Sequence, residues 1–136
     1  TGMSKADVRR VIEHGTKHLE FCIKLYNIQM DQGVYILHEH PRGARSWGNL
    51  YMRVLMGRMV VERVRGDMCT WGMKQEDQEG EGFIRKRTGF LTNASKIAER
   101  LTKKCPGTHR HIRLEGGNRT SRAAIYPDEL CKEIVK

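Results

Sequence analysis

The sequence predicts an α/β fold, because a long amphipathic helix leads directly into an apolar strand and helical and strand patterns then alternate along the chain. The strand pattern covers residues 33–41, an apolar run that begins at glycine and ends at proline. Such a run is typical of a strand covered on both faces. With 136 residues, the chain suits one domain with one core. We expect residues 1–3 to be a cloning remnant and residues 4–136 to be a single α/β domain or a fragment of one.

The first helix is predicted to begin after Ser4. The segment Ser4-Lys5-Ala6-Asp7 has the spacing of a capping box, with Asp in place of the usual Glu. Apolar residues then recur at helical spacing as far as Met30, and Gly33 is a suitable stop. A helix followed by a strand is half of a βαβ crossover. Since no strand precedes the helix in this sequence, we expect either a fragment of a larger α/β domain or a fold that begins with the helix.

The later elements are predicted from shorter patterns. Helices are predicted over 47–55, capped by Ser46, over 94–104, ended by 105–107, and over 128–135, with Pro127 at its start. Strands are predicted over 59–64, over 83–93, with a bulge at Gly89 and a helix cap at Asn93 where it ends, and over 109–114. An acidic loop over 76–81 is expected between antiparallel strands, and a second loop over 115–119.

Charge favours a polyanionic partner. The chain has 25 Lys and Arg against 16 Asp and Glu, a net charge of +9. Nucleic acid, either DNA or RNA, is the first candidate for such a partner. The alternative is a basic surface that serves solubility or contacts an acidic neighbour. No stretch approaches the roughly 20 apolar residues that span a bilayer, so no membrane contact is expected.

The cysteines indicate a reducing environment. Cys22, Cys69, Cys105 and Cys131 lie far apart in the sequence, and the chain shows no secretory signal. Both observations argue against a disulfide scaffold. We therefore expect an intracellular protein, either nuclear or cytoplasmic.

A group of candidate metal ligands lies near the end of the chain. Cys105, His109 and His111 fall within seven residues, and Cys69 could supply a fourth ligand beside a turn. Thiolate and imidazole are the ligands that zinc prefers. Their spacing is not that of a familiar zinc finger. The alternative is that the histidines contact phosphate or acid and that Cys105 closes a core.

Two further groups could serve a site. Glu39 stands at the end of the predicted strand, where open α/β sheets place their chemistry, and its carboxylate could accept a hydrogen bond from a base amine. The alternative is a strand that simply leaves into solvent. On a strand, Arg85 and Arg87 share one face, which suits phosphate contact or a charged, protected edge. The candidate nucleic-acid contacts are Arg42, Arg45, Arg85, Lys86, Arg87 and Asn93.

The order of motifs resembles a known segment. Taken together, these motifs resemble a segment of copia-type retrotransposon polyproteins and of stand-alone proteins of microbial eukaryotes, over nearly the whole chain. The motifs are 35–41 with Ala44 and 46–47, then 67–69 and 71–72, Lys86, Thr88, Asn93, Cys105, Gly107, His109, His111, 123–127 and 130–131.

That segment is in turn similar to the C-terminal half of the catalytic domain of DNA cytosine carbon-5 methyltransferase-like proteins. The resemblance implies a Rossmann-like, methyltransferase-like partial sheet flanked by helices. It also implies that Glu39 is the catalytic glutamate that holds the target cytosine, and that a substrate-contacting basic motif falls near 85–87. His40 stands where the family has Asn.

The family's nucleophile is a cysteine that follows a proline, and no cysteine here does so. The glycine-rich methyl-donor loop is missing as well. We therefore do not expect this chain alone to methylate DNA, and S-adenosylmethionine would enter only with an upstream half.

Three hypotheses follow. The first is a catalytically incomplete methyltransferase-like fragment, with a mainly parallel sheet and Glu39 facing an open cleft. The second is a basic, zinc-stabilised nucleic-acid-binding module with a metal near Cys105. The third is a structural interaction domain whose basic charge is incidental. Whether the protein is an enzyme is left open at this point.

Overall fold

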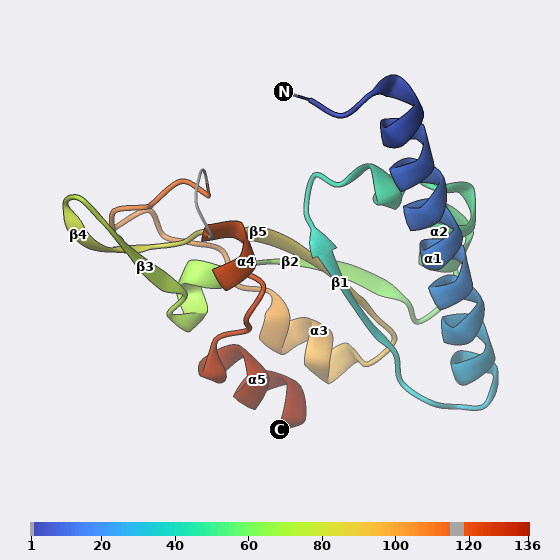
Figure 1. The fold of residues 1–136 in the computed structure, drawn as a ribbon. Helices are drawn as coiled ribbons and strands as arrows, with labels where there is room; N and C mark the ends of the chain where they lie inside the picture. Colours follow the sequence, from blue (N-terminus) through green and yellow to red (C-terminus); the bar gives the residue numbers. More distant parts are fainter. Residues whose placement is uncertain (1, 115–118) are drawn as a thin grey trace.

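A computed structural model describes residues 2–114 and 119–136 of the chain; most of the predicted loop over 115–119 lies outside them. The elements, shown in Figure 1, are α1 (Lys5–Asp31), β1 (Leu37–Pro41), the 3₁₀ turn η1 (Arg45–Gly48), α2 (Leu50–Met56), β2 (Glu62–Asp67), the 3₁₀ turn η2 (Met68–Trp71), β3 (Lys74–Asp77), β4 (Gly80–Phe83), β5 (Arg87–Thr92), α3 (Ser95–Leu101), α4 (Arg119–Arg122) and α5 (Asp128–Val135).

The fold is mixed α/β, as predicted, but its described sheets are antiparallel. One sheet has the order β1-β5-β2, and β3 and β4 form a separate hairpin. The expectation of a mainly parallel sheet is therefore wrong for the described strands. The reason lies in β5, which pairs antiparallel with both β1 and β2 and so separates two strands that run in the same direction. The strand–helix–strand pattern from β1 to β2 was read correctly, but it could not reveal the later strand between them.

The long first helix is confirmed. The Ser4 side chain accepts a hydrogen bond from the Asp7 N–H, which is half of the predicted capping box. The helix ends at Asp31, and Gly33 follows with a φ of 74°, a conformation that glycine adopts without strain.

The strand expected over 33–41 is shorter and less buried than predicted. Only Leu37–Pro41 pair with β5, and β1 lies at the edge of the sheet. Tyr35 is 70% exposed, whereas Ile36 is buried. The expectation of a strand covered on both faces is thus wrong, because the paired residues of this edge strand are only partly buried and residues 33–35 lie outside the ladder.

Helices cover both faces of the three-stranded sheet. On one face, Leu91 packs with Ile23 of α1, Trp47, and Met52 and Leu55 of α2. On the other, Phe90 packs with Met68, Trp71, Leu101 and Leu130, so that α3 and α5 lie below the sheet (Figure 1). Removing a side chain such as that of Phe90 from water contributes about 1.5–3 kcal/mol to stability.

Several boundaries moved, each for a local reason. β2 begins at Glu62 rather than 59, because Met59 and Val60 form an exposed turn in which Val60 has a φ of 70°. The predicted strand over 83–93 is interrupted around Lys86, where φ is 36°, and β4 and β5 belong to different sheets. Most of the acidic loop expected over 76–81 is part of the β3–β4 hairpin.

The predicted cap and bulge residues have other tasks. Asn49, not Ser46, caps α2 by accepting from the N–H groups of Tyr51 and Met52. Gly89 forms no described bulge but leaves room for the Trp47 ring, whose Cζ2 would lie 2.7 Å from an added Cβ. The helix over 94–104 is observed as Ser95–Leu101, and the strand over 109–114 is reduced to a single bridge between Phe83 and His111.

Candidate metal centre and basic face

Two cysteines and two histidines meet at one end of the sheet. Cys69 lies on η2, directly after β2, and Cys105, His109 and His111 lie on the segment that follows α3. The ligand atoms of the four residues all lie within 4.8 Å of one another, close enough to hold a metal ion. The sequence had named this set, and the fold brings all four together. We call it the Cys2His2 cluster.

Asp67 fixes the position of Cys105. Asp67 is 6% exposed, and its carboxylate accepts the Cys105 N–H at 2.8 Å. Its own backbone N–H donates to the Lys103 carbonyl, which docks the segment after α3 against the outer edge of β2. Gly107, with a φ of 76°, turns the chain so that its N–H points at the Cys105 Sγ at 3.3 Å. Sequence reasoning missed Asp67, although its place between a strand and a cysteine was a usable signal.

The β3–β4 hairpin holds the two histidines. Phe83 donates its N–H to the Arg110 carbonyl and accepts the Ile112 N–H, so that the histidine segment pairs with the end of β4. The Phe83 ring stacks on the His109 ring with centroids 4.1 Å apart. An added Cβ at Gly82 would lie 2.7 Å from Ile112, so a larger residue could not sit there without a shift. The imidazoles are thereby oriented by backbone pairing and by stacking.

The thiols of the cluster have different acidities. Burial and then a hydrogen bond to Cys105 raise the pKa of the Cys69 thiol to about 12. Burial also acts to raise the pKa of Cys105, but the Gly107 N–H, Cys69 and the Arg85 guanidinium together outweigh it, and the net shift is downward. Cys105 is therefore the thiol that is readier to become a thiolate, the form that binds metals.

Arginines extend from the cluster along the sheet. Arg85 Nη2 lies 3.8 Å from the Cys105 Sγ, and the positive charges of Arg85 and Arg87 are among the causes, after burial, that lower the pKa of His111. Arg42 pairs by its N–H with the Arg87 carbonyl, and Arg63 donates to the Arg42 carbonyl at 3.1 Å. The set that we call the basic face is Arg42, Arg63, Arg65, Arg85 and Arg87.

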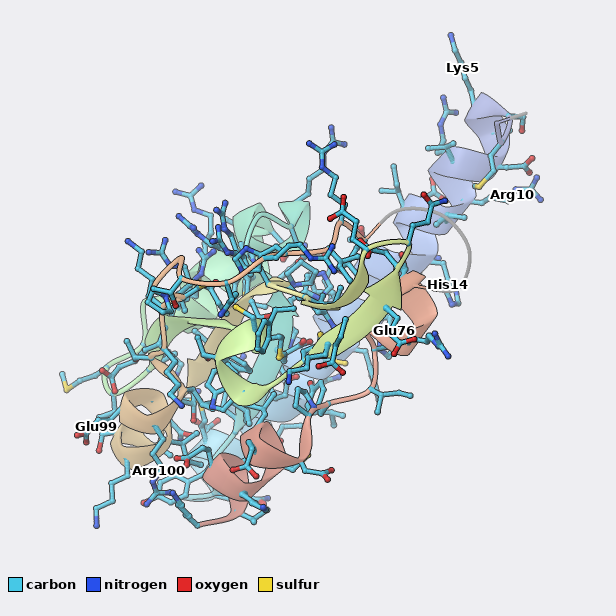
Figure 2. All side chains as sticks on the ribbon, turned by 90° about the vertical axis from the view of Figure 1, so that its left-hand side faces the viewer. Lys5, Arg10, His14, Glu76, Glu99 and Arg100 are labelled. Atoms are coloured by element: carbon cyan, nitrogen blue, oxygen red, sulfur yellow. The ribbon has the colours of Figure 1, made fainter. Side chains whose placement is uncertain are left out.

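The basic face is not neutralised within the described part of the chain. There, none of its arginines has a carboxylate oxygen within 4.0 Å. Figure 2 shows side chains that end in nitrogen gathered on the side of the strands away from α3, which carries the labelled Glu99 and Arg100. Sequence reasoning missed Arg63 and Arg65. They alternate along β2, but the strand had been placed three residues too early to include Arg65.

The other predicted phosphate contacts lie elsewhere. Lys86 Nζ points away from the basic face, donates to the Ala123 carbonyl at 2.7 Å and lies 3.9 Å from the Glu39 carboxylate. Asn93 accepts the Ile36 N–H and donates to the Val34 carbonyl, which secures the chain before β1. Arg45 is exposed on η1, at the other end of β1.

Glu39 is half-buried rather than at an open strand end. Its side chain is 19% exposed and lies beside Lys86 and the Tyr126 hydroxyl. Burial, followed by the Glu39 charge, raises the pKa of Tyr126 to about 12. One Glu39 carboxylate oxygen, Oε1, is buried without a hydrogen-bond partner among the described residues.

Comparison with known proteins gives no indication of function. The chain matches no family model, no curated protein and no solved structure. Within the described residues, no helix is both long and apolar enough to cross a membrane. The function is therefore argued from the geometry of the cluster and of the basic face.

Proposed function

We propose that the protein is a nucleic-acid-binding module whose structure is clamped by one zinc ion at the Cys2His2 cluster. The observation that carries the proposal is the spacing of the ligand atoms. Cys105 Sγ lies 3.4 Å from His109 Nε2 and 3.5 Å from His111 Nε2, and the two nitrogens are 3.1 Å apart. A tetrahedral zinc with bonds of about 2.3 Å to sulfur and about 2.0–2.1 Å to nitrogen needs sulfur–nitrogen distances of about 3.6 Å and nitrogen–nitrogen distances of about 3.3 Å.

The surroundings of the cluster also suit a structural zinc. All four ligands come from the protein, so the ion would have a closed coordination sphere with no position for a substrate. Two thiolates and zinc carry no net charge, so the occupied cluster would add no net charge beside Arg85. The zinc would join η2, the segment after α3 and, through Phe83, the hairpin. The ligands come from η2 and from the segment after α3, so metal binding would tie these segments together and would supply folding free energy.

The basic face gives this clamped domain its partner. Arginine forks bind phosphate with two parallel hydrogen bonds, and the spacing of Arg63 and Arg65 along one side of β2 places two such forks in a row. Arg63 also lies over the Trp47 ring at 4.2 Å, which limits the freedom of its side chain before it binds. We propose phosphodiester backbone contact, without assigning DNA or RNA. The unpaired thiols suit an intracellular, nuclear or cytoplasmic setting.

No specific observation favours the methyltransferase-like reading for this chain. Its Glu39 lies beside Lys86 and Tyr126, and the described sheet is antiparallel. The resemblance to copia-type polyproteins remains a prediction about ancestry. It is compatible with a basic module that acts within a larger nucleic-acid-handling protein.

The zinc half of the proposal is tested by metal content. Protein purified without chelator should contain about one zinc per chain, whereas Cys105→Ser should contain little. Cys131→Ser is the matched control, since Cys131 is exposed on α5 and does not belong to the Cys2His2 cluster. Zinc retention by Cys105→Ser equal to that of the unchanged protein would refute the assignment.

The nucleic-acid half is tested by salt dependence. We expect binding of labelled 20-residue DNA and RNA oligonucleotides to weaken steeply as salt rises, because phosphate contacts release counterions. Arg65→Gln and Arg87→Gln should each lower the affinity and reduce the salt slope by about one. Arg9→Gln, an exposed arginine on the first turns of α1, is the control and should change neither. Binding that is indifferent to salt, or equal losses from all three variants, would contradict phosphate contact by the basic face.

A further inference from the structure

A second candidate site, separate from the Cys2His2 cluster, lies between α1 and the edge strand β1. A groove of about 810 Å³ runs there, and its lining includes Ile12, Gly15 and Leu19 of α1, His40 and Glu39 of β1, and Arg45 of η1. The groove is distinct from the Cys2His2 cluster, and no residue of the basic face lines it. Tyr26 and His38 also line the groove, and the Tyr26 hydroxyl lies within hydrogen-bond distance of His38 Nδ1, at 2.9 Å.

The edge of β1 that faces away from β5 is open. Arg42 directs its N–H to Arg87 of β5, so the residues in phase with it, His40 and His38, also face β5. Glu39 lies between them and directs its N–H and C=O away from β5. The same alternation is seen at the opposite edge of the sheet, on β2. There the backbone groups of Arg65 and Asp67 face away from β5 and bond to Lys103.

Other contacts limit the open edge to a short stretch. The Pro41 carbonyl accepts from Trp47 Nε1 at 2.8 Å and from the Ala44 N–H, and proline has no N–H to offer. Among residues 2–114 and 119–136, no hydrogen-bond partner takes the backbone N–H or C=O of Glu39. The groove therefore presents the backbone N–H donor and C=O acceptor of Glu39 to a strand that would pair with β1. Ile12 and Leu19 form an apolar wall beside these groups.

We propose that this groove binds an extended, acidic peptide segment, which adds a strand to the edge of β1. The edge calls for both N–H donors and C=O acceptors, which a peptide backbone has and a phosphodiester chain lacks. Alternate side chains of the peptide would contact the apolar wall of α1. α1 forms the opposite wall of the groove, so the added strand would lie between α1 and β1.

Charge selects an acidic peptide. Among the charged groups of the lining, Glu39 has Lys86 beside it at 3.9 Å. Arg45 is exposed and has no carboxylate within 4.0 Å among the described residues. The charge left to be matched at the groove is thus positive, and a Glu or Asp side chain one or two residues from the paired position would reach Arg45.

The probe is an acetylated and amidated pentapeptide, Val-Glu-Val-Glu-Val, added to the zinc-loaded protein and followed by amide NMR. We expect a saturable downfield shift of the Glu39 amide with an affinity in the millimolar range. We expect at least a tenfold weaker effect from the same peptide with Lys in place of Glu, and from the peptide methylated on its central nitrogen. The absence of a saturable shift at Glu39 up to about 5 mM peptide would overturn the proposal.

Variants separate the groove from its surroundings. An added Cβ at Gly15 meets nothing within 4 Å, so Gly15→Phe should fold and fill the groove, and should lower peptide affinity at least tenfold. Val11→Phe, on an exposed position of α1 outside the lining, is the control and should bind as before. Equal binding by Gly15→Phe would refute the site. Shifts at Glu39 caused by an oligothymidine and not by the peptide would assign the groove to nucleic acid instead, and shifts that grow with protein concentration alone would assign it to a second copy.

Discussion

At the scale of single residues, Gly66 shows how closely the strands and helices approach. An added Cβ there would lie 2.7 Å from the Leu101 carbonyl and against the Trp71 ring. Gly66→Ala should therefore lower the free energy of unfolding by about 1–3 kcal/mol, since the neighbours are backbone and a large buried ring. Gly15→Ala is the control, because its added Cβ meets nothing and alanine favours a helix by about 0.8–1.0 kcal/mol over glycine. Urea denaturation that finds both variants equally stable would contradict the packing described here.

His38 gives the fold a dependence on pH. Burial, followed by the neighbouring His40, lowers the pKa of His38 to about 4. The unfolded chain takes up this proton near pH 6.5, whereas the folded chain takes it up only near 4, so the free energy of unfolding should fall as the pH falls through that window. We expect the free energy of unfolding of His38→Gln to fall less between pH 6.5 and 4 than that of the unchanged protein. His14→Gln, on the exposed part of α1 labelled in Figure 2, should leave the slope unchanged. Release of any bound zinc would affect all three proteins alike, so parallel slopes for the three would contradict the role of His38.

The ligand residues were the part of the site that the sequence predicted best. Thiol and imidazole side chains are rare enough that a group of them is informative, and Cys69 was correctly grouped with Cys105, which lies 36 positions later in the sequence. The arginines were harder to place, because the sequence contains many of them and only the register of β2 shows that Arg63 and Arg65 share a side. Lys86 was assigned to phosphate, but its φ of 36° turns it toward Glu39.

At the scale of elements, Asn93 joins the start of β1 to the end of β5. Its side chain accepts the Ile36 N–H at 2.8 Å and donates to the Val34 carbonyl at 3.3 Å. Asn93→Ala should lower the free energy of unfolding by about 1–3 kcal/mol, since it leaves the Ile36 N–H unpaired. Asn93→Asp keeps the acceptor and loses only the donor, so it should fall between alanine and the unchanged protein. If Asn93→Asp lowered the free energy of unfolding as much as Asn93→Ala, the bond from the Ile36 N–H to the side-chain oxygen would not be the important one.

The hairpin and the histidine segment should depend on the metal more than the sheet does. The N–H groups of Phe83 and Ile112 bond across these two segments, and the Cys2His2 cluster lies beside them. On removal of zinc, we expect hydrogen exchange at both amides to accelerate strongly, while the amide of Phe90 in β5 stays protected by the core. Uniform acceleration at all three positions would mean that the metal supports the whole fold rather than this end of it.

Local patterns predicted most helices but not how the strands are ordered. Periodicity and capping residues gave α1 and α5 nearly to the residue, because both signals are local. The order β1-β5-β2 depends on contacts between residues some 50 positions apart, such as Leu37 with Thr92, and no local pattern encodes such contacts. The resulting antiparallel sheet has no counterpart in the Rossmann-like expectation.

At the scale of the whole molecule, the two candidate binding sites lie on different parts of the three-stranded sheet. The Cys2His2 cluster and the basic face occupy the end and one side of the sheet, whereas the groove that we propose for a peptide lies between α1 and β1. Because the two sites share no lining residue, nucleic acid and peptide should bind independently. Saturating oligonucleotide should leave the Glu39 amide shift by the pentapeptide unchanged, and competition between the two ligands would place them on one surface.

The central claim is that zinc binds two sulfurs and two nitrogens of this chain. X-ray absorption at the zinc edge, measured on the purified protein, tests it most directly. The account predicts a fit of two sulfurs at about 2.3 Å and two nitrogens at about 2.0–2.1 Å, with one sulfur lost in Cys69→Ser. A coordination shell of only nitrogen and oxygen, or a shell unchanged by Cys69→Ser, would contradict it.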